Sequence, residues 1–119
     1  MQINPNTGFF DVQPGETLTI TVTASNTAYM ASFPAAPSCT TWSSTQEPAA
    51  GRETRGFVAP ASGDCFVVID FDFQPDVSGG FLPSAKYDVN VSGSNGGSFN
   101  DLPVQPPPLA SRQYKFHVV

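Results

Sequence analysis

The stretch QPGETLTITVTAS, residues 13–25, decides the fold class. It opens on the turn pair Pro14-Gly15, in which proline fixes φ and glycine supplies a positive φ. Apolar side chains then alternate with threonines: Leu18, Ile20, Val22 and Ala24 against Thr17, Thr19, Thr21 and Thr23. Strict alternation places the two sets on opposite faces of a β-strand, so we expect a core strand with a solvated threonine face. A flat ligand-binding or ice-binding face would need several aligned threonine-bearing strands, and no other segment repeats the pattern.

The same alternation recurs along the chain, whose 12 prolines leave no window of helical periodicity. Further strands are predicted over residues 7–12, 39–44, 53–59, 64–73, 86–92 and 112–119, with 53–59 and 64–73 joined as a hairpin. Their predicted inward residues are Cys65, Val67, Ile69, Phe71 and Phe73, then Tyr87, Val89 and Val91, then Tyr114, Phe116 and Val118. Residues 93–98 are predicted as a loop and residues 103–108 as a polyproline-like spacer. Together these signals predict one all-β domain over residues 1–119, a two-sheet antiparallel β-sandwich.

The charge distribution excludes two classes of partner. The formal net charge is −5, and the five basic residues are scattered, so we expect neither nucleic acid nor an anionic membrane surface to bind. The longest apolar run, residues 65–69, is too short to span a bilayer, so no membrane insertion is expected.

Composition favours a secreted location. The sequence carries no signal peptide, because Met1 is followed by neither a basic nor an apolar segment. Few lysines, abundant Ser, Thr, Gly, Asn and Pro, and two cysteines favour an extracellular or cell-surface domain over a cytosolic one. We therefore predict a module excised from a longer chain, in which other domains flank it.

The two cysteines, Cys39 and Cys65, lack the CxxC spacing of a metal site, and one histidine cannot complete a zinc set with them. The alternatives are two buried free thiols in a cytosolic domain or a disulfide in an extracellular one. The composition favours the disulfide, which would stabilise the fold by roughly 3–4 kcal/mol in the chain-entropy model.

Two segments resemble immunoglobulin-like and fibronectin-III-like sandwich modules of bacterial surface proteins. VQPGETLTITVTA, residues 12–24, is similar to the corner where a short edge strand passes through a PG turn into a buried strand. SAKYDVNVSG, residues 84–93, followed by YKFHVV, is similar to the penultimate strand with its tyrosine corner and the last strand. Tyr87 takes the place of the corner tyrosine, and Val89 that of a cysteine in antibody domains. The resemblance implies an immunoglobulin-like sandwich for adhesion, spacing or ligand binding. Cys39 and Cys65 are not spaced as the usual inter-sheet pair, so a jelly-roll-type sandwich is the alternative.

No catalytic motif is present. His117 is the only histidine and faces outward by strand parity, and no GxSxG elbow presents a serine. The loop GSNGGS, residues 93–98, lacks the lysine and following helix of a phosphate-binding loop. We therefore predict a protein that is not an enzyme and has no cofactor.

Three carboxylates suggest one exception, a calcium site. Asp70 and Asp72 share a strand face, and Asp76 follows in a loop. Oxygen-rich clusters of this kind can bind Ca²⁺. No DxDxDG run is present, and the alternative interpretation is a charged strand end that prevents edge-to-edge aggregation.

Ligand binding is predicted at one end of the sandwich. In the immunoglobulin-like order, the loop after the threonine strand and the loop 93–111 meet there. They gather aromatic, amide and carboxylate side chains suited to a protein or glycan ligand: Tyr29, Trp42, Asn95, Phe99, Asn100 and Asp101. The alternative is that Trp42 packs against the Cys39–Cys65 bridge and Phe99 pins its loop to the core.

The sequence thus predicts a non-catalytic extracellular immunoglobulin-like module for binding, adhesion or structural spacing within a larger bacterial surface or secreted protein. The alternative function is a carbohydrate-binding module or lectin, assisted by calcium at Asp70, Asp72 and Asp76.

Overall fold

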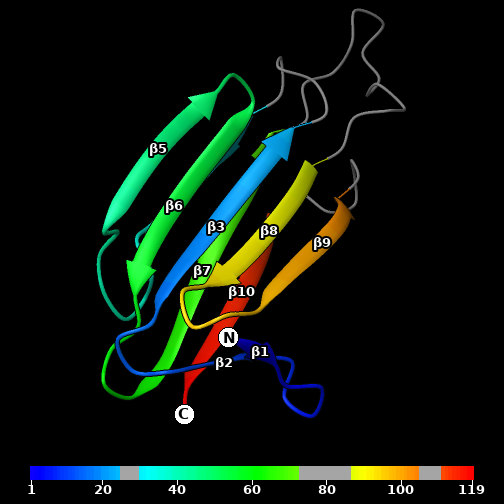
Figure 1. Ribbon diagram of the computed structural model, residues 1–119. Helices are drawn as coiled ribbons and strands as arrows, with labels where there is room; N and C mark the ends of the chain where they lie inside the picture. The colour runs from blue at the N-terminus through cyan, green and yellow to red at the C-terminus, as the bar shows by residue number, and fades with distance from the viewer. Residues whose placement is uncertain (25–29, 73–86, 105–110) are drawn as a thin grey trace, which may run out of the picture.

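The computed structural model describes residues 1–24, 30–72, 87–104 and 111–119, and the regular elements among them are β-strands (Figure 1). They are β1 Gln2–Ile3, β2 Phe10–Val12, β3 Thr17–Ala24, β4 Met30–Ser32, β5 Ser44–Ala49, β6 Arg52–Val58, β7 Gly63–Asp72, β8 Tyr87–Gly93, β9 Ser98–Val104 and β10 Ser111–Val118. Over these described ranges, no helix has the length and apolar character needed to cross a membrane.

The strands form two five-stranded sheets. Sheet A has the order β1-β2-β10-β7-β4, and sheet B has the order β5-β6-β3-β8-β9 (Figure 1). Neighbouring strands are antiparallel except β2 and β10, which run parallel. The prediction of an all-β, two-sheet antiparallel sandwich is confirmed.

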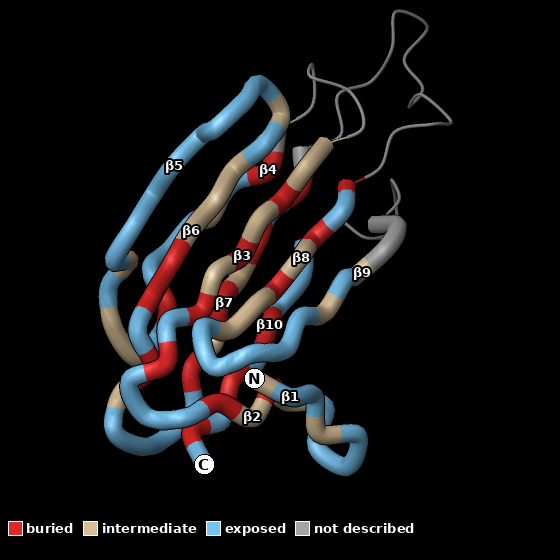
Figure 2. Tube along the Cα trace, viewed as in Figure 1, coloured by how far each residue is buried: buried red, intermediate tan, exposed pale blue. Residues whose placement is uncertain are grey.

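The core lies between the sheets and is built from the alternate residues that the sequence predicts. Leu18 and Ile20 of β3 are fully buried, as are Val67 and Ile69 of β7 in the other sheet. Buried and less buried residues alternate along these strands (Figure 2). The predicted inward residues of β8 and β10 are confirmed too, because all of them are buried: Tyr87, Val89, Val91, Tyr114, Phe116 and Val118. Phe73 lies outside the described residues.

The connection between β6 and β7 corrects one prediction. Residues 53–59 and 64–73 do not form a hairpin, because β6 lies in sheet B and β7 in sheet A. The Ala59 amide donates to the Glu16 carbonyl, and the Gly15 amide donates to the Ala59 carbonyl. These bonds tie the chain after β6 to the Pro-Gly turn at the end of the sandwich, where it crosses to the other sheet. Alternation has the same form in a hairpin and in a crossing connection.

The two edge strands of sheet B also differ from the predictions. The strand predicted over residues 39–44 is not formed, because residues 39–43 are not in a strand. β5 begins at Ser44, and all of its residues are exposed. β9 lies where a loop and a polyproline-like spacer were expected. Its Pro103 is compatible with a strand because one side of an edge strand has no ladder hydrogen bonds to make.

The structure places Tyr87 in the sheet that does not contain the closing strand β10. The resemblance equates residues 84–93 with the penultimate strand, but among the described residues β9 stands between this segment and β10. β8 pairs with β3 and β9 in sheet B, whereas β10 pairs with β7 and β2 in sheet A. Tyr87 therefore begins a strand of the sheet opposite the closing strand, although it is buried.

Cys39 and Cys65 form a disulfide, as predicted, with their Cα atoms 5.1 Å apart. The bridge fixes the segment that crosses from β4 in sheet A to β5 in sheet B. Beside it, the Ser38 amide donates to the Phe66 carbonyl (3.0 Å) and the Phe66 amide donates to Ser38 Oγ (2.9 Å). These contacts cover a part of the β7 edge that β4 leaves open, because β4 pairs only with residues 70–72.

A buried carboxylate organises the end of the sandwich where both termini lie (Figure 1). Glu16 is 1% exposed. It accepts hydrogen bonds from the Gln13 amide (2.9 Å), the Asn95 amide (3.3 Å) and the Met1 amino group (3.0 Å). Burial raises the pKa of Glu16, but these hydrogen bonds outweigh it and hold the pKa below its ordinary value. A side chain at Gly93 would overlap the carboxylate, so glycine is required there.

Candidate functional site

A row of polar side chains crosses the outer face of sheet A near this end. In the strand register His117 of β10 stands between Asp64 of β7 and Asp11 of β2, and Gln2 of β1 continues the row. His117 faces outward because Phe116 and Val118 on either side of it are buried in the core. Neighbouring strands lie about 4.8 Å apart, so the side chains of the row are adjacent on one surface.

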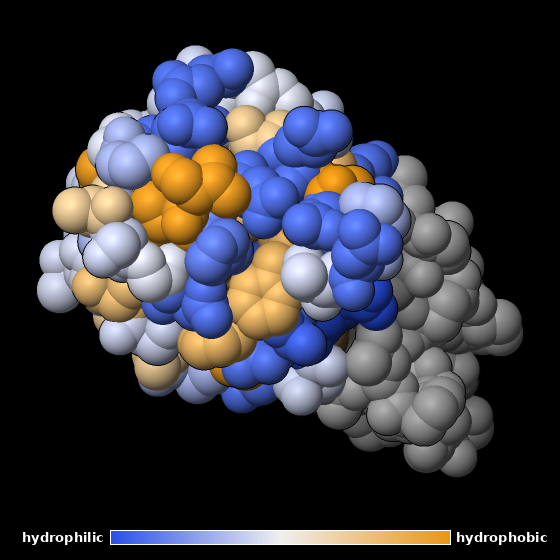
Figure 3. Space-filling view, turned by 90° about the horizontal axis from the view of Figure 1, so that it is seen from below, coloured by the Kyte–Doolittle hydropathy of each residue, from blue (hydrophilic) through white to orange (hydrophobic). Residues whose placement is uncertain are grey.

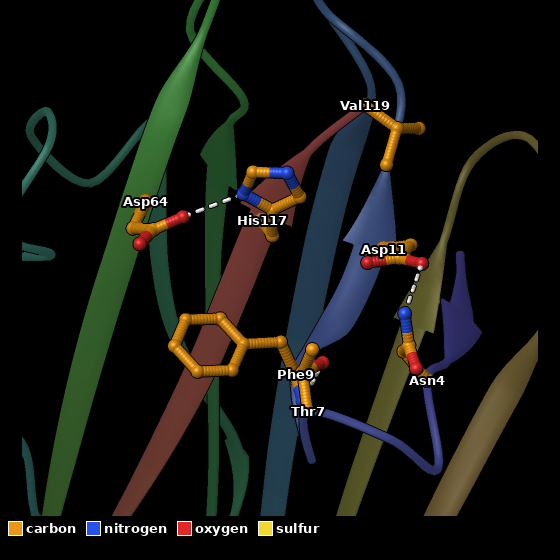
Figure 4. A pocket seen from close by; sticks show the side chains of 7 residues that line it. All are labelled: Asn4, Thr7, Phe9, Asp11, Asp64, His117 and Val119. Atoms are coloured by element: carbon orange, nitrogen blue, oxygen red, sulfur yellow. Dashed lines mark hydrogen bonds and ion pairs between the residues drawn. The ribbon is translucent and has the colours of Figure 1, made fainter.

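The two carboxylates of the row are each held through one oxygen. His117 Nδ1 lies 2.6 Å from Asp64 Oδ1, in a pair whose side chains are about half exposed. Asp11 Oδ2 accepts a hydrogen bond from Asn4 Nδ2 at 3.3 Å. Figure 4 shows these interactions on the two sides of the His117 ring. Among the described residues the second oxygen of each carboxylate has no hydrogen bond.

The chain before β2 forms a tight loop beside this row. The Asn4 amide donates to the Phe9 carbonyl at 2.8 Å, and the Gly8 amide donates to the Asn4 carbonyl at 2.8 Å. The Phe9 amide donates to Thr7 Oγ1 at 3.2 Å. Gly8 has a φ of 76°, which glycine adopts without strain. The short sequence NPNTGF therefore fixes both Asn4 and Phe9 at the rim of the row.

Phe9 supplies an aromatic wall. Its ring packs edge-to-face against Phe66, with centroids 6.1 Å apart, and Lys115 Nζ lies 5.6 Å from the Phe9 centroid. Phe66 and Lys115 are cross-strand partners on the outer face of sheet A. The ring is thus anchored by the residues that precede His117 and follow Asp64 on this face.

Loop and row together line a hollow of about 380 Å³: Asn4, Thr7, Phe9, Asp11, Asp64, His117 and Val119 (Figure 4). A hollow of this size can take a small molecule or one side chain of a partner. An adjoining polar hollow of about 470 Å³ shares Asp11 and Val119 with it. In Figure 3, which views this end of the molecule, hydrophobic residues stand as separate spots among hydrophilic ones. The surface here is therefore mixed in character.

The lining offers charge and hydrogen bonds beside an aromatic ring. Thr7 is its one hydroxyl, and that oxygen already accepts a hydrogen bond from the Phe9 amide. Both cysteines are bonded to each other. Within the described ranges, no three His, Cys, Asp or Glu side chains are grouped so as to hold a metal ion. These residues can bind a polar or charged group.

The structure separates several of the residues predicted to form a ligand site at one end of the sandwich. Leu18 at the start of β3 pairs with Gly93, whereas Ala24 at its end pairs with Tyr87. Because β8 runs antiparallel to β3, the turn that holds Asn95 lies beside the first residues of β3 and at the opposite end of the strand from Ala24. Tyr29 lies outside the described residues.

Of the three predicted aromatic ligand residues, the two that the structure describes contact other rings. Trp42 is partly buried, with its ring edge-to-face to Phe33 (5.4 Å) and to Phe57 (6.1 Å). Phe99 is partly buried against Phe10, with centroids 5.3 Å apart. Both side chains therefore extend the core.

The two predicted polar residues of β9 are separated by the sheet. Asn100 is exposed, and its Oδ1 accepts a hydrogen bond from Asn90 Nδ2 at 3.4 Å. Asp101 instead accepts a hydrogen bond from the Tyr114 hydroxyl of sheet A at 2.7 Å and pairs with Arg112. Burial raises the pKa of Tyr114, and the bond to Asp101 raises it further. Asp101 thus links the two sheets.

Of the predicted calcium ligands, the structure describes one side chain. Asp70 is exposed on the outer face of β7, with Ser111 and Ser32 as its cross-strand partners. The side chain of Asp72 and the whole of Asp76 lie outside the described residues. The calcium site stays a prediction.

Sequence reasoning placed His117 on the outer face but assigned neither it nor its neighbours Asp11 and Asp64 to a site. Strand parity marks Asp11, Asp64 and His117 as outward, and this was the available signal. Their adjacency depends on the parallel pairing of β2 with β10 and the antiparallel pairing of β7 with β10. Neither pairing is encoded locally in the sequence.

Searches with this chain against protein-family models, curated proteins and solved structures find no match. The functional proposal below therefore rests on the fold and on the chemistry of the site.

Proposed function

We propose that this chain is a non-catalytic binding domain of a secreted or cell-surface protein, with the hollow at Asp11, His117 and Asp64 as its ligand site. The observation that carries the proposal is the site itself. Three outward polar residues from three strands line a hollow beside an anchored phenylalanine, and two carboxylates each keep one oxygen for a ligand.

The strand order supports an immunoglobulin-like relationship. In that fold the second, fifth and fourth strands are neighbours in one sheet, and the third, sixth and seventh in the other. Sheet B contains β3, β6 and β5 in this arrangement, and sheet A contains β4, β7 and β10. The hairpin β8–β9 lies beside β3, at the place of the first strand of that fold. Domains of this architecture commonly serve binding and adhesion, which is an argument by analogy.

The disulfide supports the extracellular part of the proposal. Disulfides persist in oxidising compartments and are rare in the reducing cytosol. The Cys39–Cys65 bridge fastens a long inter-sheet crossing to β7, so the fold has a structural use for it.

The proposal is tested by NMR titration of the ¹⁵N-labelled protein with small probes. The probe set contains the Nα-acetyl methylamides of lysine, arginine, glutamine and glutamate, together with neutral monosaccharides. We expect saturable shifts in the amides of residues 4–11, 64–66 and 115–119. Asp88→Asn is the charge-matched control for substitutions of Asp11 and Asp64, because Asp88 is exposed on sheet B, away from the hollow. The absence of saturable shifts with every probe would contradict a binding role at this hollow and favour structural spacing. Shifts centred on Trp42 would place binding elsewhere.

A further inference from the structure

We infer that the hollow receives a cationic group, the lysine or arginine side chain of a partner protein. This inference rests on the proposed binding function and names its ligand class. The polar residues of the lining select the charge, and its apolar residues suit the methylene stem of a long side chain.

The charge follows from the carboxylates. Asp11 and Asp64 stand on either side of His117, and each uses a single oxygen in the described contacts. A carboxylate accepts hydrogen bonds at both oxygens, so each retains acceptor capacity. The lining contains no lysine or arginine. A donor-rich cation placed over His117 would lie between the two carboxylates and be attracted by both, whereas an anion would be repelled by both.

The neighbouring lysine pairs with neither carboxylate of the hollow. Lys115 is on the same outer face as His117 but forms no ion pair within the described part of the chain. Its ammonium lies over the Phe9 ring instead, at 5.6 Å from the centroid. The ring that borders the hollow therefore already takes part in a cation–π contact within the molecule, for which a cation from a partner would compete.

The apolar part of the lining suits the stem of such a side chain. Phe9 and Val119 stand among the polar residues of the hollow, and Val119 is 55% exposed. Lysine and arginine pack their methylene stems on apolar surface while the charged head reaches acceptors beyond it. A neutral sugar would also find hydrogen bonds here, and it is the competing ligand in the test. The net charge of −5 would additionally attract a cationic partner at long range.

The probes are the same acetylated methylamides, with glutamine as the neutral analogue of comparable length. We expect lysine and arginine probes to saturate shifts around the hollow and the glutamine and glutamate probes to bind at least about tenfold more weakly. Raising the salt from about 20 mM to about 300 mM should weaken the cationic probes, because exposed charges are screened.

Three variants sharpen the test. Asp11→Asn with Asp64→Asn should weaken the cationic probes by about tenfold, since two exposed ion pairs are lost. Asp88→Asn also removes one negative charge, but on sheet B. It should alter binding by less than about twofold. Lys115→Met removes the internal cation that competes for Phe9, so it should strengthen cationic binding by about threefold. Melting temperatures of all variants verify that each one is folded.

The outcomes separate the two proposals. If the glutamine probe or a sugar binds as tightly as lysine, or if the double variant binds lysine unchanged, the inference is wrong while the binding function stands. If Lys115→Met weakens lysine binding, the assigned role of Phe9 is wrong and the inference is overturned. If no probe of any charge gives saturable shifts at the hollow, the proposed function itself fails.

Discussion

On the outer face of sheet B, Thr21 of β3 lies between Thr54 of β6 and Asn90 of β8, and Gln46 and Asn100 extend this row to the edge strands. The next row is built from Ser44, Gly56, Thr19, Ser92 and Ser98. Both rows consist of small or amide-bearing residues without charge. On the outer face of sheet A, the row at the hollow consists of Gln2, Asp11, His117 and Asp64.

The two faces differ in how their polar groups are satisfied. Thr21 Oγ1 lies 3.3 Å from Thr54 Oγ1, and Asn90 Nδ2 donates to Asn100 Oδ1 at 3.4 Å. Hydroxyls and amides both donate and accept, so such a row bonds with itself. Carboxylates only accept, so Asp11 and Asp64 require donors from other groups. Alternation decides which side chains face outward, and donor–acceptor chemistry decides which outward row is left with capacity for a partner.

The largest expected loss of stability comes from removing the disulfide, which joins Cys39 to Cys65 of sheet A. Cys39→Ala with Cys65→Ala should lower the free energy of unfolding by about 3–4 kcal/mol, because the bridge closes a long loop in the unfolded chain. The cysteines are 26 residues apart. The β7 edge also loses a fixed cover at Phe66, so amides of β7 should exchange faster than those of β3. Urea unfolding and amide hydrogen exchange measure the two effects.

Reduced wild-type protein is the control for the cavity that the alanines create. Its stability should fall nearly as far as that of the double variant. Equal acceleration of exchange in β3 and β7 would contradict a specific role of the bridge at the sheet A edge.

The comparison of the two faces also shows which features could be predicted from the sequence. The inward residues of β3, β7 and β10 were predictable, because a half-buried strand requires a period of two. The disulfide was predictable as a pairing because two cysteines allow one bridge. The hollow was not, because Asp11, Asp64 and His117 are far apart in sequence and are joined by strand register. The hairpin prediction for residues 53–73 failed for the same reason, since parity says which face is inward but not which sheet a strand joins.

The next largest loss of stability is expected from substituting Glu16, whose carboxylate joins the β2–β3 turn to the β8–β9 turn. Glu16→Gln should lower the free energy of unfolding at pH 7 by about 2 kcal/mol, because the new amide group would point donors at backbone donors. The folded-state pKa of Glu16 is below its unfolded value. The stabilisation is therefore present above the unfolded pKa and is lost as the pH falls through the folded pKa. Urea unfolding between neutral and acid pH should show a smaller acid loss in the variant.

Glu47→Gln is the matched control, because Glu47 is exposed on the edge strand β5. Its stability should differ from that of the wild type by less than about 0.5 kcal/mol. An unchanged acid profile in Glu16→Gln would mean that Glu16 is not the group that links stability to pH.

A smaller effect is expected at the contact between the sheets. Tyr114→Phe removes the hydroxyl that donates to Asp101 and should cost about 1 kcal/mol in the free energy of unfolding. Asp101 keeps its ion pair with Arg112, which limits the loss. Probe binding at the hollow should be unaffected, because Tyr114 faces the core. A loss of several kcal/mol would indicate that Asp101 depends on the tyrosine alone.

The smallest effect is expected on the threonine row. Thr21→Val with Thr54→Val should change the free energy of unfolding by less than about 0.5 kcal/mol, because both partners of a partly exposed hydrogen bond are removed together. Valine keeps the β-branched shape that suits a strand. Urea unfolding and the lysine-probe titration should both match the wild type, in contrast to Asp64→Asn in the titration. If the double valine variant abolished probe binding, sheet B would carry the ligand surface. A loss of more than about 1 kcal/mol in the free energy of unfolding would mean that the threonine row stabilises the fold by more than one partly exposed hydrogen bond can.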